Sequence, residues 1–256
     1  MADASALETV LRRDRLFVAG GLSLVVALAA AWLLSGAGMQ TGGVMEAMQP
    51  MAWTPGYALV VLAMWWVMMA AMMLPAAAPM ILLFAAVNRR TRERGGPYVP
   101  TAAFVLGYLL VWGAFGALAT TLQWALDRAA LLSPMMAASS VALGGAILIA
   151  AGLYQLTPLK HACLRRCRSP IAFVSSHWRP GARGAVRMGV VHGAFCLGCC
   201  WVLMGLLFYG GVMSPVWIIG IAVYVLVEKT APFGDRIGSA AGIALVAWGG
   251  IVIAAA

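Results

Sequence analysis

The chain has 256 residues, of which 63% are hydrophobic and only 10% are charged, and its formal net charge is +9. A water-soluble fold of this length has too little interior to hide so much apolar surface, so the composition excludes an ordinary soluble globular protein. It indicates an all-α integral membrane protein, a polytopic bundle of about seven transmembrane helices that forms a single domain over residues 1–256.

Seven apolar stretches approach or exceed the roughly 20 residues that a helix needs to cross a bilayer. The first, 16–34, follows three arginines and is interpreted as an uncleaved anchor, with a cleaved signal peptide as the alternative. The second, 57–87, is too long for one straight span, and Pro75 and Pro79 predict a bend or a break within it. The other five are expected near 101–126, 135–156, 188–209, 215–229 and 238–255.

The basic residues predict the orientation of these spans. With the N-terminus inside, all of the 17 Lys and Arg residues except Arg128 fall on the cytoplasmic side. We therefore expect a multi-pass protein of the bacterial inner membrane, with its N-terminus inside and its C-terminus outside. Anionic lipid headgroups then explain the positive charge, and no nucleic-acid partner is expected.

The fifth predicted span contains soft metal ligands. At about 100° per residue, His192, Cys196 and Cys199 share a stripe about 60° wide, and Cys200 and Met204 lie on its flank. Thiolate and thioether groups favour Cu(I) among the biological metals. Any one of these residues alone would be interpreted as an ordinary hydrophobic residue of a membrane helix. The whole cluster predicts a copper(I) site.

Methionines are concentrated in the second predicted span, ahead of Pro75. They form two parallel i, i+4 rows, Met64, Met68 and Met72 in one and Met69 and Met73 in the other. From the helical rise, Met73 and Cys199 lie about 21 Å and about 17 Å from the inner ends of their spans, so a shared site is expected near the middle of the bilayer. The alternative is that these methionines only pack the core. The outer loop adds spaced methionines, similar to those of copper-uptake proteins, at Met45, Met48 and Met51.

Cys163 and Cys167 lie in the basic connection at 157–187, which is predicted to be cytoplasmic. Their i, i+4 spacing suits a two-coordinate Cu(I) ion better than a four-ligand zinc site. A reducible dithiol and a pair of cysteines without function are the alternatives. Glu228 and Lys229 end the sixth span and are interpreted as an anchor whose charged ends reach the inner interface, with a role for Glu228 in moving protons or metal as the alternative.

Four motifs together carry a resemblance to a known family. The chain resembles bacterial integral membrane proteins described as metal-binding, some of which are called copper chaperones for tyrosinase-like polyphenol oxidases. The resemblance implies copper handling for a copper-dependent enzyme. The matching motifs run from Trp66 to Pro75, from Tyr154 to Lys160 with Cys163 and Cys167, from Cys196 to Met204, and over Glu228 and Lys229.

These observations favour a copper(I) chaperone, not an enzyme, that delivers its ion to a copper-dependent enzyme or another copper carrier. Its expected ligands are one imidazole, five thiols and four thioethers: His192, Cys196, Cys199, Cys200, Cys163, Cys167, Met68, Met72, Met73 and Met204. Cys163 and Cys167 would form the cytosolic docking point. A metal permease with the same ligands, a membrane thiol-redox protein and a scaffold without metal are the alternatives. The sequence contains no pattern typical of a hydrolase or an ATP-driven pump.

Overall fold

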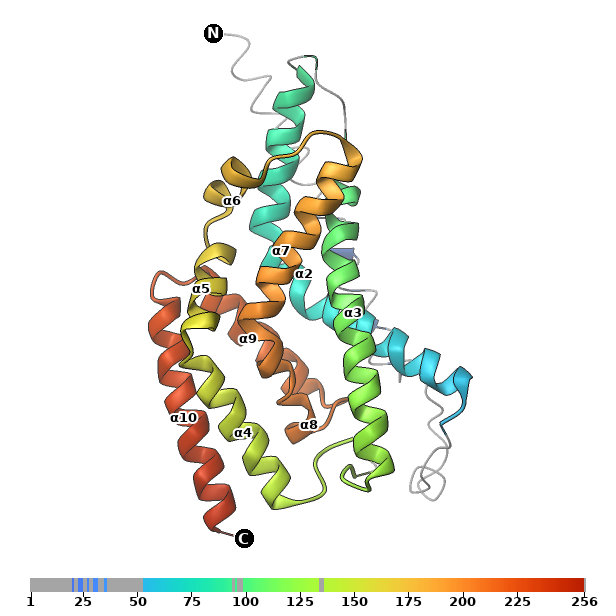
Figure 1. Ribbon diagram of the computed structural model, residues 1–256, viewed down its shortest axis with the longest axis vertical. Coiled ribbons are helices and arrows are strands. Elements are labelled where there is room, and N and C mark those ends of the chain that lie inside the picture. The colour runs from blue at the N-terminus through green and yellow to red at the C-terminus, as the bar shows by residue number, and fades with distance from the viewer. Residues whose placement is uncertain are drawn as a thin grey trace.

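The computed structural model describes residues 53–93, 95, 99–133 and 136–255, with a few positions between Gly20 and Ser35. The predicted first span at 16–34 lies for the most part outside the described residues. So does the methionine motif of the outer loop. The described residues form helices and no strand, which confirms the all-α class. Figure 1 shows the arrangement of the nine labelled helices: α2 (Pro55–Glu93), α3 (Thr101–Arg128), α4 (Val141–Gln155), α5 (Pro158–Cys167), α6 (Pro170–His177), α7 (Gly181–Met204), α8 (Leu207–Gly210), α9 (Pro215–Thr230) and α10 (Gly234–Ala254).

Among the described residues, four helical segments are long and apolar enough to cross a membrane: Pro55–Glu93, Thr101–Arg128, Gly181–Gly210 and Gly234–Ala254. The pair α4 and α5, which meet at an angle of 65°, makes a fifth if it is counted as one span. α9 has 16 residues and is shorter than these segments. The number of seven spans and their orientation stay predictions.

α2 continues as one helix through Pro75 and Pro79, so the second span bends and does not break. Figure 1 shows the change of direction near its middle. A proline inside a helix removes one backbone hydrogen bond and crowds the preceding turn, which is the expected cause of such a bend.

The connection at 157–187 is helical for most of its length, because it contains α5, α6 and the first turns of α7. α5 begins where Thr157 accepts a hydrogen bond from the Lys160 backbone N–H at 3.3 Å and Pro158 occupies the first helical position. α7 begins at Gly181 and not at Met188. The fifth span is therefore longer than its apolar part.

Glycines allow two pairs of helices to approach closely. A Cβ atom at Gly107 of α3 would lie 2.1 Å from the Val186 carbonyl oxygen of α7, and one at Gly189 of α7 would lie 2.0 Å from the Phe104 carbonyl oxygen of α3. α4 and α10 meet in the same way, since a Cβ at Gly152 would lie 2.6 Å from a carbonyl oxygen of α10. Helices packed this closely make rigid supports for the side chains between them.

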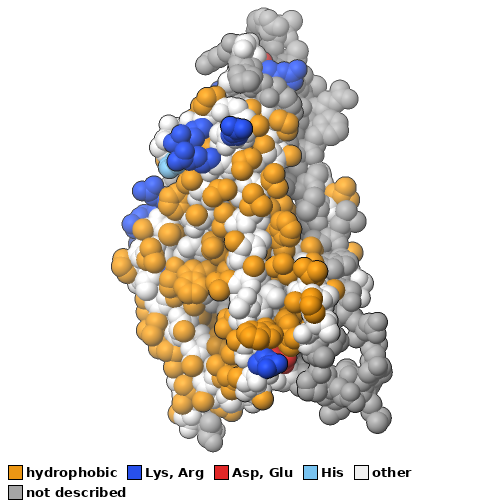
Figure 2. All heavy atoms as spheres, turned by 45° about the vertical axis from the view of Figure 1, so that its right-hand side comes forward, with side chains coloured by type: hydrophobic (Ala, Val, Ile, Leu, Met, Phe, Trp, Pro, Cys, Tyr) orange, Lys and Arg blue, Asp and Glu red, His pale blue; other side chains and the backbone are white. Residues whose placement is uncertain are grey.

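The surface of the helical part is largely apolar. Figure 2 shows hydrophobic side chains over most of the visible face, with Lys and Arg side chains gathered mainly toward its upper part. Large hydrophobic side chains are exposed along α3 and α10, among them Leu106, Leu118, Ile243 and Ile251.

Candidate metal centre

Three cysteines of α7 face the interior, as the helical stripe predicts. Cys196, Cys199 and Cys200 are each at most 1% exposed. The thiols of Cys199 and Cys200 each donate a hydrogen bond to the Cys196 carbonyl oxygen, at 3.0 Å in both cases. This bonding to the preceding turn keeps all three sulfur atoms on one side of the helix.

Cys196 of α7 contacts one residue of α3 and one residue of α9. Its sulfur accepts a hydrogen bond from the Lys229 amine at 2.9 Å and lies 3.0 Å from the Tyr108 hydroxyl. That hydroxyl also donates to the Met73 carbonyl oxygen at 3.1 Å. The Cys196 sulfur is thus surrounded by polar groups that are themselves buried.

A thioether from α2 completes this group of sulfur atoms. The Cys200 thiol lies 3.9 Å from the Met73 sulfur and points toward it. The structure therefore brings thiols of α7 and a thioether of α2 into one buried region. Met68, Met72 and Met204 are buried in the surrounding core. Met72 also borders, with Pro75, a cavity of about 280 Å³ between α2 and α9.

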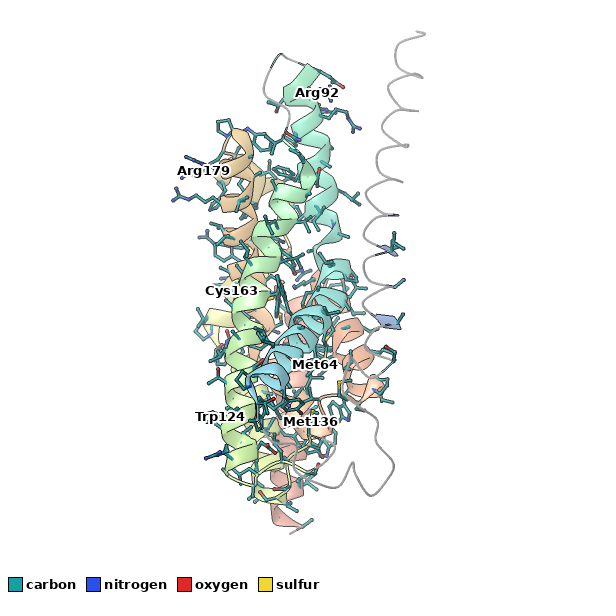
Figure 3. The ribbon with its side chains drawn as sticks, turned by 90° about the vertical axis from the view of Figure 1, so that its right-hand side faces the viewer. Met64, Arg92, Trp124, Met136, Cys163 and Arg179 are labelled. Atoms are coloured by element: carbon teal, nitrogen blue, oxygen red, sulfur yellow. The ribbon has the colours of Figure 1, made fainter. Side chains whose placement is uncertain are left out.

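The structure places α5, which carries Cys163 and Cys167, directly against α7. The role of these two cysteines as a docking point stays a prediction. Cys167 is buried at the end of α5, which packs against α7. Cys163 is partly exposed, and a Cβ atom at Gly198 would lie 2.7 Å from its sulfur. Figure 3 shows Cys163 between the end of the molecule that carries Arg92 and Arg179 and the opposite end with Trp124 and Met136. All five cysteines are free.

His192 lies on the same face of α7, in an aromatic surrounding. Its ring is 3% exposed, and its centroid lies 5.3 Å from that of Phe173 and 5.9 Å from that of Tyr108. Among the described residues, its buried Nδ1 atom has no hydrogen-bond partner. An imidazole nitrogen without a partner in an apolar site is available as a ligand for a soft cation.

The interpretation of Glu228 and Lys229 as an interfacial anchor is wrong. Glu228 is fully buried and forms an ion pair with the fully buried Lys160, and the Tyr224 hydroxyl donates to the Glu228 carboxylate at 3.3 Å. Lys229 is 9% exposed and points instead to Cys196. Charged residues in apolar segments usually face the protein interior and pair with other groups. Applied to the apolar segment that ends at Glu228 and Lys229, this rule predicts the burial that the structure shows for both.

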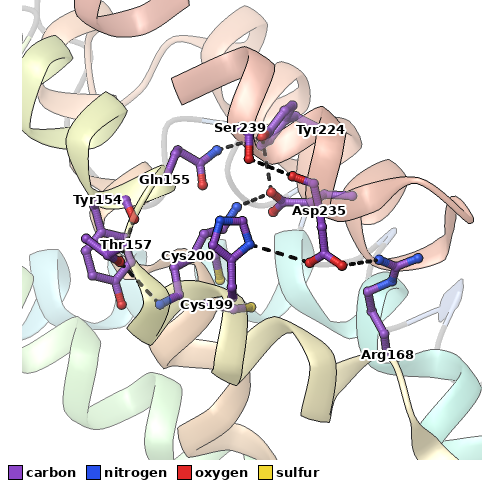
Figure 4. Close-up of polar contacts among 12 residues, drawn as sticks. Tyr154, Gln155, Thr157, Arg168, Cys199, Cys200, Tyr224, Asp235 and Ser239 are labelled. Carbon is purple, nitrogen blue, oxygen red and sulfur yellow. Dashed lines mark hydrogen bonds and ion pairs between the residues drawn. The ribbon is translucent and has the colours of Figure 1, made fainter. Parts of the chain in front are cut away.

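Figure 4 shows part of this polar network close to Cys199 and Cys200. The Gln155 side chain donates to the Tyr224 hydroxyl at 2.6 Å. Beside it, Asp235 lies 3.6 Å from the Arg168 guanidinium and ties the start of α10 to the end of α5. This network of hydrogen bonds and ion pairs joins four helices, α4, α5, α9 and α10, close to the thiol cluster.

The donor set fits a soft, weakly coordinated cation. Among the residues that the structure describes, no group of three or more His, Cys, Asp and Glu side chains is placed to hold one metal ion. A linear Cu(I) complex needs only a pair of thiolates, and thioethers such as that of Met73 can add to it. The geometry thus defines an all-helical protein whose core brings sulfur atoms of α2 and α7 close together.

A family model described as "PpoB2: Copper chaperone" matches residues 62–252, which extend from α2 into α10. The chain belongs to this copper chaperone family. The match confirms the resemblance drawn from the sequence motifs and supports copper binding and interaction with a copper enzyme or carrier. No curated protein and no solved structure matches the chain.

Proposed function

We propose that this protein binds Cu(I) inside its helical bundle and passes it to a copper-dependent enzyme or another copper carrier. The observation that carries the proposal is the convergence of Cys196, Cys199 and Cys200 with Met73 in one buried region. Cys167 is also buried, on the helix α5 that packs against α7. In the proposal, His192 adds an imidazole ligand, and Met68, Met72 and Met204 form weaker thioether positions.

Transfer proceeds by exchange of ligands, so no acid–base catalyst is required. The thiols lose their protons when they bind the ion, and each ligand of the partner replaces one ligand of this chain. Cys163 is the most accessible of the five cysteines and lies beside Gly198 on α7. It is the ligand that we expect to meet the partner first.

In the same proposal, the chain is a single integral membrane domain of the bacterial inner membrane, with seven spans, the N-terminus inside and the C-terminus outside. The exposed leucines and isoleucines of α3 and α10 support contact with lipid, because they have no cover within the described residues. The segments long enough to cross a membrane support insertion in the same way.

The test is metal analysis of the full chain, purified in detergent and loaded with Cu(I) under reducing conditions. We expect copper to bind to the wild type and to be lost from the variant Cys196→Ser/Cys199→Ser/Cys200→Ser. Met73→Leu should weaken binding, whereas Met80→Leu should not, because Met80 is equally buried but lies about 10 Å farther along α2. Equal copper content in the wild type and the triple serine variant refutes the proposal.

A metal permease is the second candidate, and one observation favours it. Buried methionines continue along much of α2, at Met64, Met68, Met69, Met72, Met73 and Met80. A row of weak ligands of this kind suits stepwise movement of an ion. Copper flux into sealed vesicles that contain the protein decides between the two functions: a chaperone binds copper without sustained flux, whereas a permease accumulates it.

A further inference from the structure

A buried ammonium group lies within the thiol cluster. The Lys229 amine donates to the Cys196 sulfur at 2.9 Å, and the thiols of Cys199 and Cys200 are bonded to the backbone carbonyl of the same Cys196. Only 9% of Lys229 is exposed. A buried charge of this kind is costly unless an opposite charge accompanies it.

The carboxylate next to Lys229 in the chain does not supply that opposite charge. Adjacent residues of a helix point about 100° apart, and Glu228 is directed to Lys160, with which it forms a fully buried ion pair. The group to which the Lys229 amine donates is the Cys196 thiol, which also contacts the Tyr108 hydroxyl. The charge of the ammonium is therefore balanced when thiols of the cluster bind an ion as thiolates.

We propose that Lys229 is a positioning residue that makes the site selective for a monovalent soft cation. The inference rests on the proposed function. Two thiolates around Cu(I) form a complex with a single negative charge, which the ammonium cancels. The same two thiolates around a divalent ion form a neutral complex, and the ammonium is then left in the core without a counter-charge. The N–H···S hydrogen bond to Cys196 also fixes the direction of one ligand.

The experiment compares the affinities of the detergent-purified full chain for Cu(I) and for Cd(II), each by competition with a chelator under reducing conditions. The variants are Lys229→Met, which removes the charge, Lys229→Gln, which keeps a hydrogen-bond donor without the charge, and Lys229→Arg, which keeps the charge. The matched control is Lys160→Met/Glu228→Gln, which removes the neighbouring buried ion pair and leaves the net charge unchanged. Thermal unfolding of each variant identifies those that fold.

We expect Lys229→Met and Lys229→Gln to lose about 100-fold in Cu(I) affinity, since unit charges a few ångströms apart inside a protein interact at least this strongly. Their Cd(II) affinity should stay the same or rise. Lys229→Arg should lie closer to the wild type, and the control should keep the wild-type ratio of the two affinities. Lys229→Met and Lys229→Gln both remove the charge, so the test needs only one of them to fold.

Three results overturn the inference while the proposed function stands: equal losses for the two ions, no loss for either ion, or a control that changes the ratio as strongly as Lys229→Met does. A wild-type protein that binds no Cu(I) at all defeats the proposed function itself. The two failures are therefore distinguishable.

Discussion

A single methyl group at Gly189 tests whether the close crossing of α3 and α7 supports the candidate site. A Cβ atom there would lie 2.0 Å from the Phe104 carbonyl oxygen and 3.0 Å from the Tyr108 backbone nitrogen. Real Cβ atoms essentially never approach another heavy atom to less than 3.0 Å. Because the obstacle is backbone and not a flexible side chain, Gly189→Ala must separate the two helices by about 1 Å or more.

The cost of this separation follows from the packing. Forcing extra volume into a well-packed core costs about 1–3 kcal/mol, and the rigid obstacle places Gly189→Ala at the upper end. Alanine recovers about 1 kcal/mol of helix propensity, so we expect a net loss of about 2 kcal/mol. The contact of 3.0 Å between Tyr108 of α3 and Cys196 of α7 also lengthens, so the affinity for Cu(I) should fall.

The assay is unfolding of the purified protein in detergent by a denaturant titration, followed by circular dichroism. Gly250→Ala is the matched control, because a Cβ atom at Gly250 of α10 would have nothing within 4 Å. It should be neutral or stabilise the protein by up to about 1 kcal/mol. If Gly189→Ala is as stable as Gly250→Ala, the close crossing of the two helices is refuted.

Three further predictions concern the polar core and the thiols. Glu228→Gln leaves Lys160 buried without its counter-charge and should lower the free energy of unfolding by about 3–5 kcal/mol. Adding Lys160→Met should recover most of that loss. The same denaturant titration measures both variants, and a double variant whose loss is the sum of the two single losses contradicts the ion pair. Cys163 should react with a maleimide before the other cysteines in the native protein, because the other four are buried. Peptide mapping by mass spectrometry measures the order of labelling, and equal labelling of all five cysteines would contradict the prediction. Trp65→Phe removes the hydrogen bond of 2.8 Å to the Gln123 side chain and should lower the free energy of unfolding by about 1–3 kcal/mol. A double-mutant cycle with Gln123→Leu should show a coupling energy between the two residues, and its absence would contradict this bond.

The sequence predicted the helices of this fold because long apolar runs need to satisfy their backbone groups internally. The expected spans at 101–126, 215–229 and 238–255 differ from α3, α9 and α10 by only a few residues at their ends. The start of α7 differs by more, because the apolar run begins only at residue 188 while the preceding residues, which include Arg183 and Arg187, belong to the basic connection. Backbone hydrogen bonds of a helix do not depend on side-chain polarity, so α7 continues through these arginines to Gly181.

The candidate site was likewise predictable from the sequence only in part. The inward stripe of α7 follows from helical periodicity alone, and the structure buries Cys196, Cys199 and Cys200 as expected. The approach of Cys167 depends on the 65° angle between α4 and α5, which no local pattern encodes. Similarly, the sequence places Lys229 at the end of an apolar run, but the depth of that end is set by how α9 packs against its neighbours.

The hydrogen bonds of the cluster indicate where binding of an ion begins. Cys199 and Cys200 donate their thiol protons to a carbonyl of their own helix, so each must give up that bond before it binds an ion. Cys196 makes a different bond: because the Tyr108 hydroxyl donates to the Met73 carbonyl oxygen, the Cys196 thiol donates to Tyr108 at 3.0 Å, and its sulfur accepts from the Lys229 amine at 2.9 Å. All three thiols of α7 therefore exchange a hydrogen bond for a bond to the metal. Cys196 is the one among them whose sulfur also accepts a bond, from the Lys229 amine, that can persist when the ion is bound, so we expect it to act as the first ligand.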